Sequence, residues 1–183
     1  LPTVTGKWPV RSGGAFYNNR DIYAGTFDQT LIQGLDVKNP AVRMLDMSRI
    51  GPVLVGEDAV VKQGPPVTAM IVQNTNPAVV APETVKVHAG FRREDFFLCV
   101  HEQFMTDTAK FADIVLPATM FLEHDDIYSS GGHGHFHFAP KAIDGPAGCR
   151  SNHFVLSELA GRLGSTHRGF QMSELEIIDE TLT

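Results

Sequence analysis

Two short apolar runs of this chain are each followed by polar side chains that could bind a nucleotide. Asn74 and Asn76 follow the run VTAMIV, and His101 and Glu102 follow the run FFLCV. An acidic residue just past a strand can bind the paired hydroxyls of a ribose, and amide side chains can read a base edge or a pyrophosphate. The alternative for the segment NTNP is an ordinary turn, because Asn and Pro favour turns through local backbone interactions.

Thr106 and Thr108 lie at the start of the helical pattern TDTAKFA. Unpaired backbone N–H groups and the positive end of the helix dipole make such a start suitable for holding a phosphate. Ordinary N-capping by the same threonines is the alternative, and the sequence does not separate the two.

Histidines gather near the glycine-rich segment in the second half of the chain. His133, His135 and His137 alternate through HGHFH, with His124 nearby, so an extended strand could present several imidazoles on one side. Their spacing differs from that of zinc modules, and the surrounding glycines suit a loop. We therefore predict no metal ligand, and a free-standing histidine-rich metal binder is the weaker alternative.

No catalytic residue is predicted in the chain. The sequence has no Ser in a Gly-x-Ser-x-Gly elbow, no Gly-x-Gly-x-x-Gly after an apolar run and no phosphate-loop motif. Neither a nucleophilic hydrolase nor an ATPase is indicated.

The elements that must position these side chains repeat an order of apolar run, polar turn and helical pattern. The runs VTAMIV, FFLCV and DIVL do not alternate polar and apolar residues, which is typical of parallel strands buried on both faces. We predict an α/β fold with an open, mostly parallel sheet and flanking helices. In such a sheet ligands bind beyond the carboxyl ends of the strands, where Gln73 and Gln103 are also expected.

The rest of the chain divides into a loop-rich start and one domain. Residues 1–35 are rich in glycine and lack periodicity, so we predict an irregular segment that packs on the domain. The domain is predicted to span 36–183, with its core at 67–164. Its helices are expected at 39–51, where Asn39 is the cap, and in the segments SNHFVLSELAGRLG and SELEIIDETL.

The composition suits a globular protein and excludes several classes. The 183 residues are 43% hydrophobic and 20% charged, which is ordinary for one soluble domain. The formal net charge of −6 and the absence of a basic run argue against a nucleic-acid partner. No stretch approaches the roughly 18 apolar residues that a membrane span needs. The cysteines Cys99 and Cys149 are too few for a disulfide framework.

The order of these motifs resembles the molybdopterin oxidoreductase family, typified by dimethyl sulfoxide reductase, nitrate reductases and formate dehydrogenases. The most specific element is T-x-T-A-x-x-A-D-I-V-L-P, which runs from Thr106 to Pro117 and is followed by Glu123. The resemblance implies a Rossmann-like domain that grips the guanosine and pyrophosphate end of a molybdopterin guanine dinucleotide.

The resemblance also implies the residues of this site. Asn76 matches the Asn of the family's Gly-x-Asn-Pro turn, in which Asn74 replaces the glycine. His101 and Glu102 match a polar and acidic pair that often has Asp in the second place. His124 matches a position that can be a basic cofactor contact, and Asn152 matches a position that often holds Asp. The implied cofactor-binding residues are Asn74, Asn76, His101, Glu102, Thr106, Thr108, His124 and Asn152.

The resemblance further implies that the chain is an internal fragment of a catalytic subunit several times its length, inactive by itself. The parent would carry molybdenum or tungsten bis(molybdopterin guanine dinucleotide) and perform two-electron redox chemistry, as oxygen-atom transfer or dehydrogenation. An iron–sulfur cluster, where the family has one, would bind outside this stretch. Partners would be the remaining domains of the same polypeptide and an electron-transfer subunit. We expect a cytoplasmic protein, with periplasmic export of the parent as the alternative. A non-catalytic scaffold of the same ancestry is the alternative function.

Overall fold

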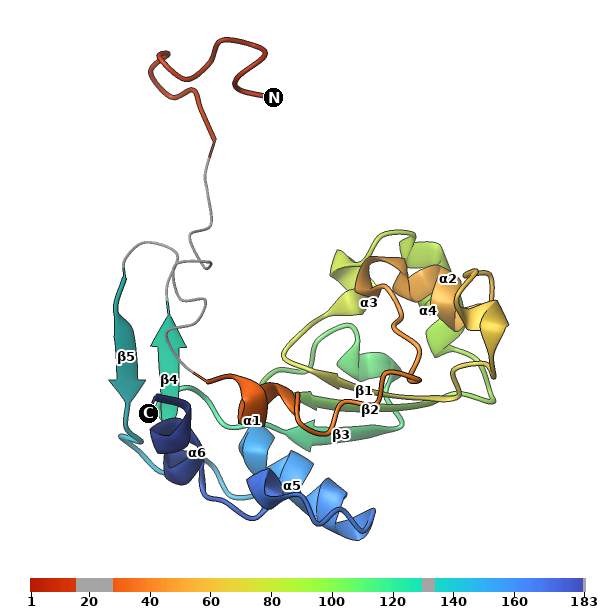
Figure 1. Cartoon of the computed structure of the whole chain (residues 1–183). Helices are drawn as coiled ribbons and strands as arrows, with labels where there is room; N and C mark the ends of the chain where they lie inside the picture. Colours follow the sequence, from red (N-terminus) through yellow and green to blue (C-terminus); the bar gives the residue numbers. More distant parts are fainter. Residues whose placement is uncertain (16–27, 130–133, 183) are drawn as a thin grey trace.

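A parallel three-stranded sheet forms the centre of the fold (Figure 1). The computed structural model describes residues 1–15, 28–129 and 134–182. The strands lie in the order β1-β2-β3, with bounds β1 (Ala69–Gln73), β2 (Phe97–Glu102) and β3 (Ile114–Pro117). Together with the flanking helices, this sheet confirms the predicted α/β fold.

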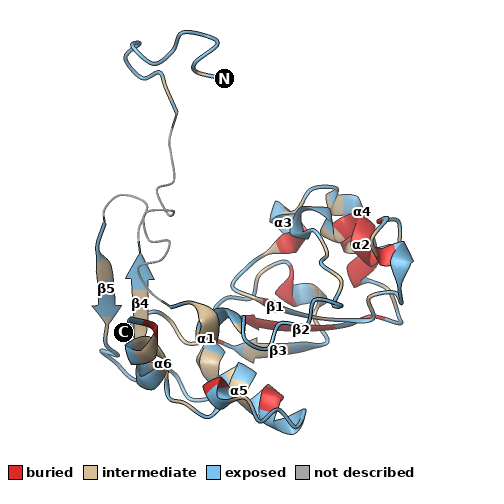
Figure 2. Ribbon diagram, in the orientation of Figure 1, coloured by how far each residue is buried: buried red, intermediate tan, exposed pale blue. Residues whose placement is uncertain are grey.

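The middle strand, β2, explains why the apolar runs do not alternate. Leu98, Val100 and His101 are fully buried, and Cys99 between them is 8% exposed. Figure 2 shows this continuous burial along β2. A central strand covered on both faces needs no polar side chains facing solvent, so its sequence reads as one apolar run.

The helices α2 (Ile50–Leu54), α3 (Pro77–Val80) and α4 (Thr84–Phe91) lie together on one face of the sheet (Figure 1). Buried apolar side chains from these helices and the sheet form one core. Helices α2 and α4 approach closely at Gly90, where an added Cβ would lie 2.3 Å from the Cβ of Leu54.

The predicted helix at 39–51 is wrong over most of its length. Asn39 caps a single turn, in which its Oδ1 accepts from the N–H of Ala41, and a short 3₁₀ helix, η2 (Met47–Arg49), precedes α2. The guanidinium of Arg43 donates to the carbonyl oxygens of Val61 and Pro65. The apolar face expected of this segment has nothing to pack on, since Val42 is 68% exposed, and an isolated short helix is marginal without packing.

After β3 the chain leaves the parallel sheet and forms an antiparallel hairpin. Its strands are β4 (Asp126–Ser129) and β5 (Phe136–Ala139), paired in their own two-stranded sheet. Besides η2, the short 3₁₀ helices in the described residues are η3 (Val61–Gln63), η4 (Ala109–Phe111) and η5 (Arg168–Phe170).

Two C-terminal helices follow the hairpin, as predicted. Ser151 caps α5 (Asn152–Arg162) by accepting from the N–H of Phe154. Ser173 and Glu176 bond each other's backbone N–H groups at the start of α6 (Glu174–Leu182), which is a capping box.

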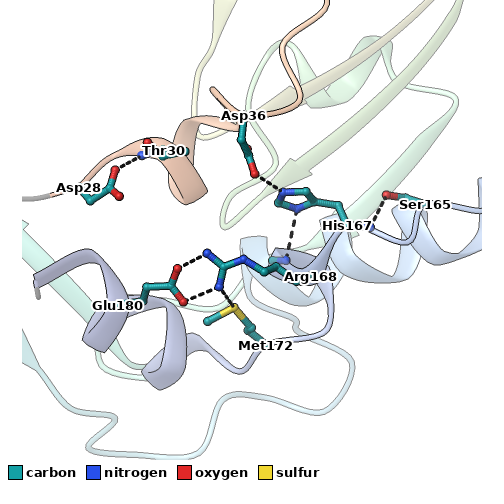
Figure 3. Close-up of polar contacts among 9 residues, drawn as sticks. Asp28, Thr30, Asp36, Ser165, His167, Arg168, Met172 and Glu180 are labelled. Carbon is teal, nitrogen blue, oxygen red and sulfur yellow. Dashed lines mark hydrogen bonds and ion pairs between the residues drawn. The ribbon is translucent and has the colours of Figure 1, made fainter.

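Residues 28–36 reach this C-terminal part through polar contacts (Figure 3). The one-turn helix α1 (Thr30–Gln33) contacts α6, and the N–H of Asp28 donates to the carbonyl of Thr181 at 3.0 Å. Asp36 accepts from Nε2 of His167 at 3.0 Å, and this hydrogen bond lowers the pKa of the Asp36 carboxyl. Residues 1–15 form local turns away from the sheet (Figure 1), and the predicted division into 1–35 and 36–183 stays a prediction.

None of the helices in the described part of the chain has the length and apolar character needed to cross a membrane.

Candidate functional site

The carboxyl ends of the three parallel strands meet at one edge of the sheet. Gln73 lies opposite His101, and Glu102 lies opposite Pro117. The edge continues beyond β3, where Ala118 forms an isolated parallel bridge with Arg150. The segment that precedes α5 is thereby brought to the edge on which the polar residues were predicted.

Asn74 forms the turn that follows β1. Its φ is +52°, in the left-handed region that glycine adopts readily and that Asn tolerates better than most other residues. The replacement of the family's glycine by Asn74 is therefore compatible with this turn. The Asn74 side chain is exposed and has no hydrogen-bond partner among the described residues.

Asn76 and Thr108 join the turn after β1 to the loop after β2. Oδ1 of Asn76 accepts from the backbone N–H of Thr108 at 3.1 Å and from its hydroxyl at 2.8 Å. The Thr108 hydroxyl in turn accepts from the N–H of Ala78 at 3.0 Å. Thr108 is fully buried, so its side chain acts within the fold.

His101 is also fully buried, and both of its ring nitrogens have partners inside the protein. Its Nε2–H donates to the carbonyl oxygen of Arg150 at 3.1 Å. Its Nδ1 accepts from the side-chain amide of Gln73 at 3.2 Å. The histidine links three segments at the sheet edge and leaves no ring nitrogen free.

Glu102, in contrast, is half-buried and keeps part of its carboxylate available. Its Oε1 accepts from the N–H of Gln103 at 2.7 Å, and its other oxygen has no partner among the described residues. The amide of Gln103 donates to the carbonyl of Thr119 at 2.9 Å, which ties the end of β2 to the segment after β3.

Thr106 lies just before the single turn of η4, whose N-cap residue is Thr108. The hydroxyl of Thr106 accepts from the N–H of Ala109 at 3.1 Å. The Thr106 hydroxyl thus satisfies the first backbone N–H of η4, as a capping side chain would, and a phosphate role stays a prediction.

His124 and Asn152 line pockets beside the sheet edge. His124 shares a hydrogen bond of 2.8 Å with the hydroxyl of Thr119, and its Nε2 is 3.8 Å from Asp126 Oδ2. It borders a pocket of about 220 Å³ with Arg150. His124 and Asn152 together border a larger pocket of about 550 Å³ near α1, α5 and α6. Asn152 is exposed and has no partner among the described residues.

The larger pocket does not contain Asn74 or Glu102. Its lining comes from α1, the segment around the start of β4, and the C-terminal helices, and it mixes apolar with polar side chains. Of the predicted residues His124 and Asn152 border it, whereas the free polar groups of Asn74 and Glu102 lie at the ends of β1 and β2. We take the strand ends as the candidate site, because ligand position in an open parallel sheet follows the carboxyl ends of its strands.

No group of three or more His, Cys, Asp or Glu side chains within the described ranges could hold a metal ion. Of the alternating histidines, His133 lies outside the described residues, while His137 lies in β5. Burial in the middle of β2 raises the pKa of the Cys99 thiol.

Sequence reasoning missed Thr119 and Arg150, which both bind the side chains or backbone of predicted residues. The N–H of Thr119 donates to the carbonyl of Arg150 at 3.1 Å. A bridge of one residue leaves no periodic pattern, so no local signal in the sequence marks Arg150 as part of the sheet.

The fold and this edge define an open α/β domain with polar side chains at the carboxyl ends of its parallel strands. The chain belongs to the molybdopterin oxidoreductase family: the family model described as "Molybdopterin oxidoreductase" matches residues 38–162, which is more than half of the 183 residues.

Similar proteins are several times longer than this chain. The "Probable oxidoreductase YoaE" of Bacillus subtilis (strain 168) is 37% identical over 183 residues, which cover 100% of this chain and 26% of that protein. The "Periplasmic nitrate reductase" of Desulfovibrio desulfuricans is 35% identical over 99 residues, covering 54% of this chain and 13% of that protein. The chain thus spans about a quarter of the length of the relative that it matches throughout.

A solved structure shows the same fold. "Acetylene Hydratase from Pelobacter acetylenicus" superposes with a TM-score of 0.59 at 23% sequence identity, over 73% of this chain and 18% of that one. At this identity the likeness concerns the fold alone.

Proposed function

We propose that this chain is the part of a molybdopterin oxidoreductase that holds the guanosine and pyrophosphate end of a molybdopterin guanine dinucleotide. The observation that carries the proposal is the half-buried carboxylate of Glu102 at the carboxyl end of β2, with one oxygen left without a partner among the described residues. A carboxylate in this place can accept from the paired hydroxyls of a ribose or from guanine N–H groups.

The other polar groups at the edge suit a nucleotide to different degrees. The side chains of Asn74 and Asn152 are exposed and have no partner in the described part of the chain, so both can meet a ligand. The amide nitrogen of Asn76 can also donate, because its bonds to Thr108 use only the amide oxygen. His101 and Thr108 contribute by holding these groups in place and not by direct contact.

The bound metal and pterin supply two-electron redox chemistry to the parent enzyme, as oxygen-atom transfer or dehydrogenation. The residues of this chain bind and orient the nucleotide end of that group. The remaining domains of the polypeptide would complete the pocket, and this chain alone would be inactive. We further propose a cytoplasmic parent that passes electrons to a separate subunit and binds any iron–sulfur cluster outside this stretch.

The proposal is tested with Glu102→Gln in the full-length protein. The substitution keeps the shape of the side chain and removes the charge, and a charge-assisted hydrogen bond contributes about 1.5–3 kcal/mol. The dinucleotide is therefore expected to dissociate roughly tenfold faster or more. At each time point the protein is retained on a filter, and its remaining dinucleotide is measured as guanosine monophosphate after acid hydrolysis.

Glu94→Gln is the matched control, because Glu94 is exposed and lies just before the amino end of the same strand. It is expected to lose the dinucleotide at the wild-type rate. Equal release rates in Glu102→Gln and wild-type protein would contradict the proposal, as would a wild-type protein that yields no guanosine monophosphate.

A further inference from the structure

One buried hydrogen-bond network connects the sheet to the start of α5. His101, with no exposed surface, bonds Gln73 on β1 through Nδ1 and the carbonyl of Arg150 through Nε2. The two bonds span sequence separations of 28 and 49 residues, so the network joins segments that the chain itself leaves far apart.

The partners fix the tautomer of this histidine. A carbonyl oxygen can only accept, so Nε2 must carry the hydrogen that it donates to Arg150. Nδ1 is then an acceptor, which suits the amide NH₂ of Gln73 at 3.2 Å. His101 and Gln73 lie opposite each other in the register of β1 and β2, so the two side chains leave neighbouring strands at the same level.

The network ties the start of α5 to the parallel sheet, whereas the side chains of Ser151 and His153 tie it to Glu174 and to the carbonyl of Met172 at the C-terminal side. The backbone of Arg150 also donates to the carbonyl of Pro117 at 3.0 Å and accepts from the N–H of Thr119 at 3.1 Å. These bonds belong to an isolated bridge and not to a continuous ladder. On the N-terminal side the chain turns through Gly148, whose φ is +95°. The carbonyl of Arg150 thus depends on His101 for its second donor.

The first residue of α5 follows two positions after this tethered carbonyl. Ser151 caps the helix, and Asn152 begins it with an exposed side chain that has no partner in the described ranges. The position of Asn152 relative to the sheet is therefore set in part by the Arg150 backbone, while the bonds of Ser151 and His153 set it relative to the C-terminal segment.

We propose that His101, as its Nε2–H tautomer and together with Gln73, is a positioning residue that sets the start of α5 so that Asn152 contacts the nucleotide bound at Glu102. This inference rests on the proposed function. It assigns His101 an indirect role and gives Asn152 the direct contact.

The test uses two substitutions of His101 in the full-length protein. His101→Gln places an amide nitrogen at the ε position, where it can still donate to the carbonyl of Arg150, whereas the shorter side chain of His101→Asn cannot reach that far. The dinucleotide, measured as guanosine monophosphate after hydrolysis, is expected to dissociate about tenfold faster from His101→Asn and within about twofold of the wild-type rate from His101→Gln.

Val100→Ala is the control for a loss of stability alone. Val100 is fully buried in the same strand and has no polar side-chain atom, so its truncation lowers the melting temperature without touching the network. The inference is overturned if His101→Asn releases nucleotide no faster than Val100→Ala after correction for melting temperature, or if His101→Gln does not restore the wild-type rate.

A double substitution separates positioning from general destabilisation. If His101 acts through Asn152, then adding His101→Asn to Asn152→Ala gives no further increase in release rate. Additive effects of the two substitutions would overturn the inference.

Gln73→Met provides a second test if His101→Asn does not fold. It removes the donor to Nδ1 of His101 and is expected to speed the release of the dinucleotide by less than tenfold. An unchanged release rate would overturn the inference.

Failure of this inference can be told apart from failure of the proposed function. If Glu102→Gln speeds release and His101→Asn does not, only the positioning role fails. If the wild-type protein yields no guanosine monophosphate, the proposed function itself fails.

Discussion

Glu102 and His101 are neighbours in β2, and their surroundings give them opposite roles. Successive side chains of a strand point to opposite faces of the sheet. His101 is fully buried with both nitrogens bonded, whereas Glu102 is half-buried and has an oxygen without a partner among the described residues. A ligand at the sheet edge can therefore meet the carboxylate and not the imidazole.

The left-handed turn at Asn74 predicts how this position responds to substitution. Asn74→Ala is expected to lower the free energy of unfolding by about 1 kcal/mol, because a Cβ without a compensating polar group disfavours a positive φ. Asn74→Gly should be neutral or slightly stabilising, since its φ of +52° suits glycine. Urea unfolding monitored by circular dichroism measures both, and equal losses in the two variants would contradict this account of the turn.

The bonds between Asn76 and Thr108 predict coupled effects on stability. Thr108→Val removes the hydroxyl that accepts from the N–H of Ala78 and donates to Oδ1 of Asn76. Because this hydroxyl is buried, the loss is expected to lower the free energy of unfolding by about 1–3 kcal/mol. Asn76→Ala breaks the same contact, so the double substitution should lose less than the sum of the single losses. Strict additivity in the double-mutant cycle would show that the two residues act independently.

The sequence predicts which residues lie at the candidate site but not which of them the fold satisfies with internal hydrogen bonds. The positions after the strands follow from apolar runs and turn residues. The bonds of His101 to Arg150 and of Asn76 to Thr108 span 49 and 32 residues, and no local pattern encodes contacts at such separations. Burial could therefore not be assigned to His101 and Thr108 in advance.

At the scale of elements, strands and the longer helices follow directly from the sequence. The strands β1, β2 and β3 overlap the three apolar runs, and α5 and α6 lie within the two C-terminal segments predicted to be helical. The helix expected at 39–51 fails because the tertiary contacts of Arg43 hold that segment in another conformation. An apolar sequence pattern predicts a helix or strand well where the apolar side chains of that pattern also pack against the rest of the fold.

The close approach of α2 and α4 predicts opposite results for two glycines. Gly90→Ala would place a Cβ 2.3 Å from Leu54, so it is expected to lower the free energy of unfolding by about 1–3 kcal/mol. Gly161→Ala is the control, because Gly161 lies in α5 with nothing within 4 Å of an added Cβ. It should stabilise by about 0.5–1 kcal/mol, as helical glycine to alanine usually does. Similar losses in both variants would contradict the packing described for α2 and α4.

At the scale of the whole molecule, hydrogen bonds and ion pairs lower the pKa of many carboxyls. In Asp58 the largest cause is the hydrogen bond from Arg49, with an Nε–Oδ2 distance of 2.7 Å. The same direction of pKa shift, from hydrogen bonds to neighbouring side chains or backbone, is found at Asp28, Asp36, Asp46, Glu57, Asp95, Asp144, Glu176 and Glu180.

These shifts predict how stability depends on pH. A carboxyl whose pKa is lower in the folded than in the unfolded state stabilises fully above its unfolded value, which is 3.8 for Asp, and this stabilisation disappears as the pH falls through the folded value. The free energy of unfolding should therefore drop below about pH 4. Asp58→Asn should be less stable than wild type at pH 6, and the difference should shrink at lower pH. A constant difference between pH 6 and pH 2.5 would contradict the ion pair.

At the scale of the whole chain, the alignment with YoaE spans all 183 residues but only 26% of that relative's length. In the proposed function the polar edge of this chain holds the nucleotide end of the cofactor, and the chemistry at the metal would depend on residues elsewhere in the polypeptide. The α/β fold and the family both follow from the sequence motifs.

The most direct measurement is the content of the purified full-length protein. Metal analysis and chromatography of the acid hydrolysate should give molybdenum or tungsten in stoichiometric amount, together with guanosine monophosphate from the dinucleotide. A folded full-length protein that yields neither the metal nor guanosine monophosphate would contradict the account and would favour a non-catalytic scaffold of the same ancestry.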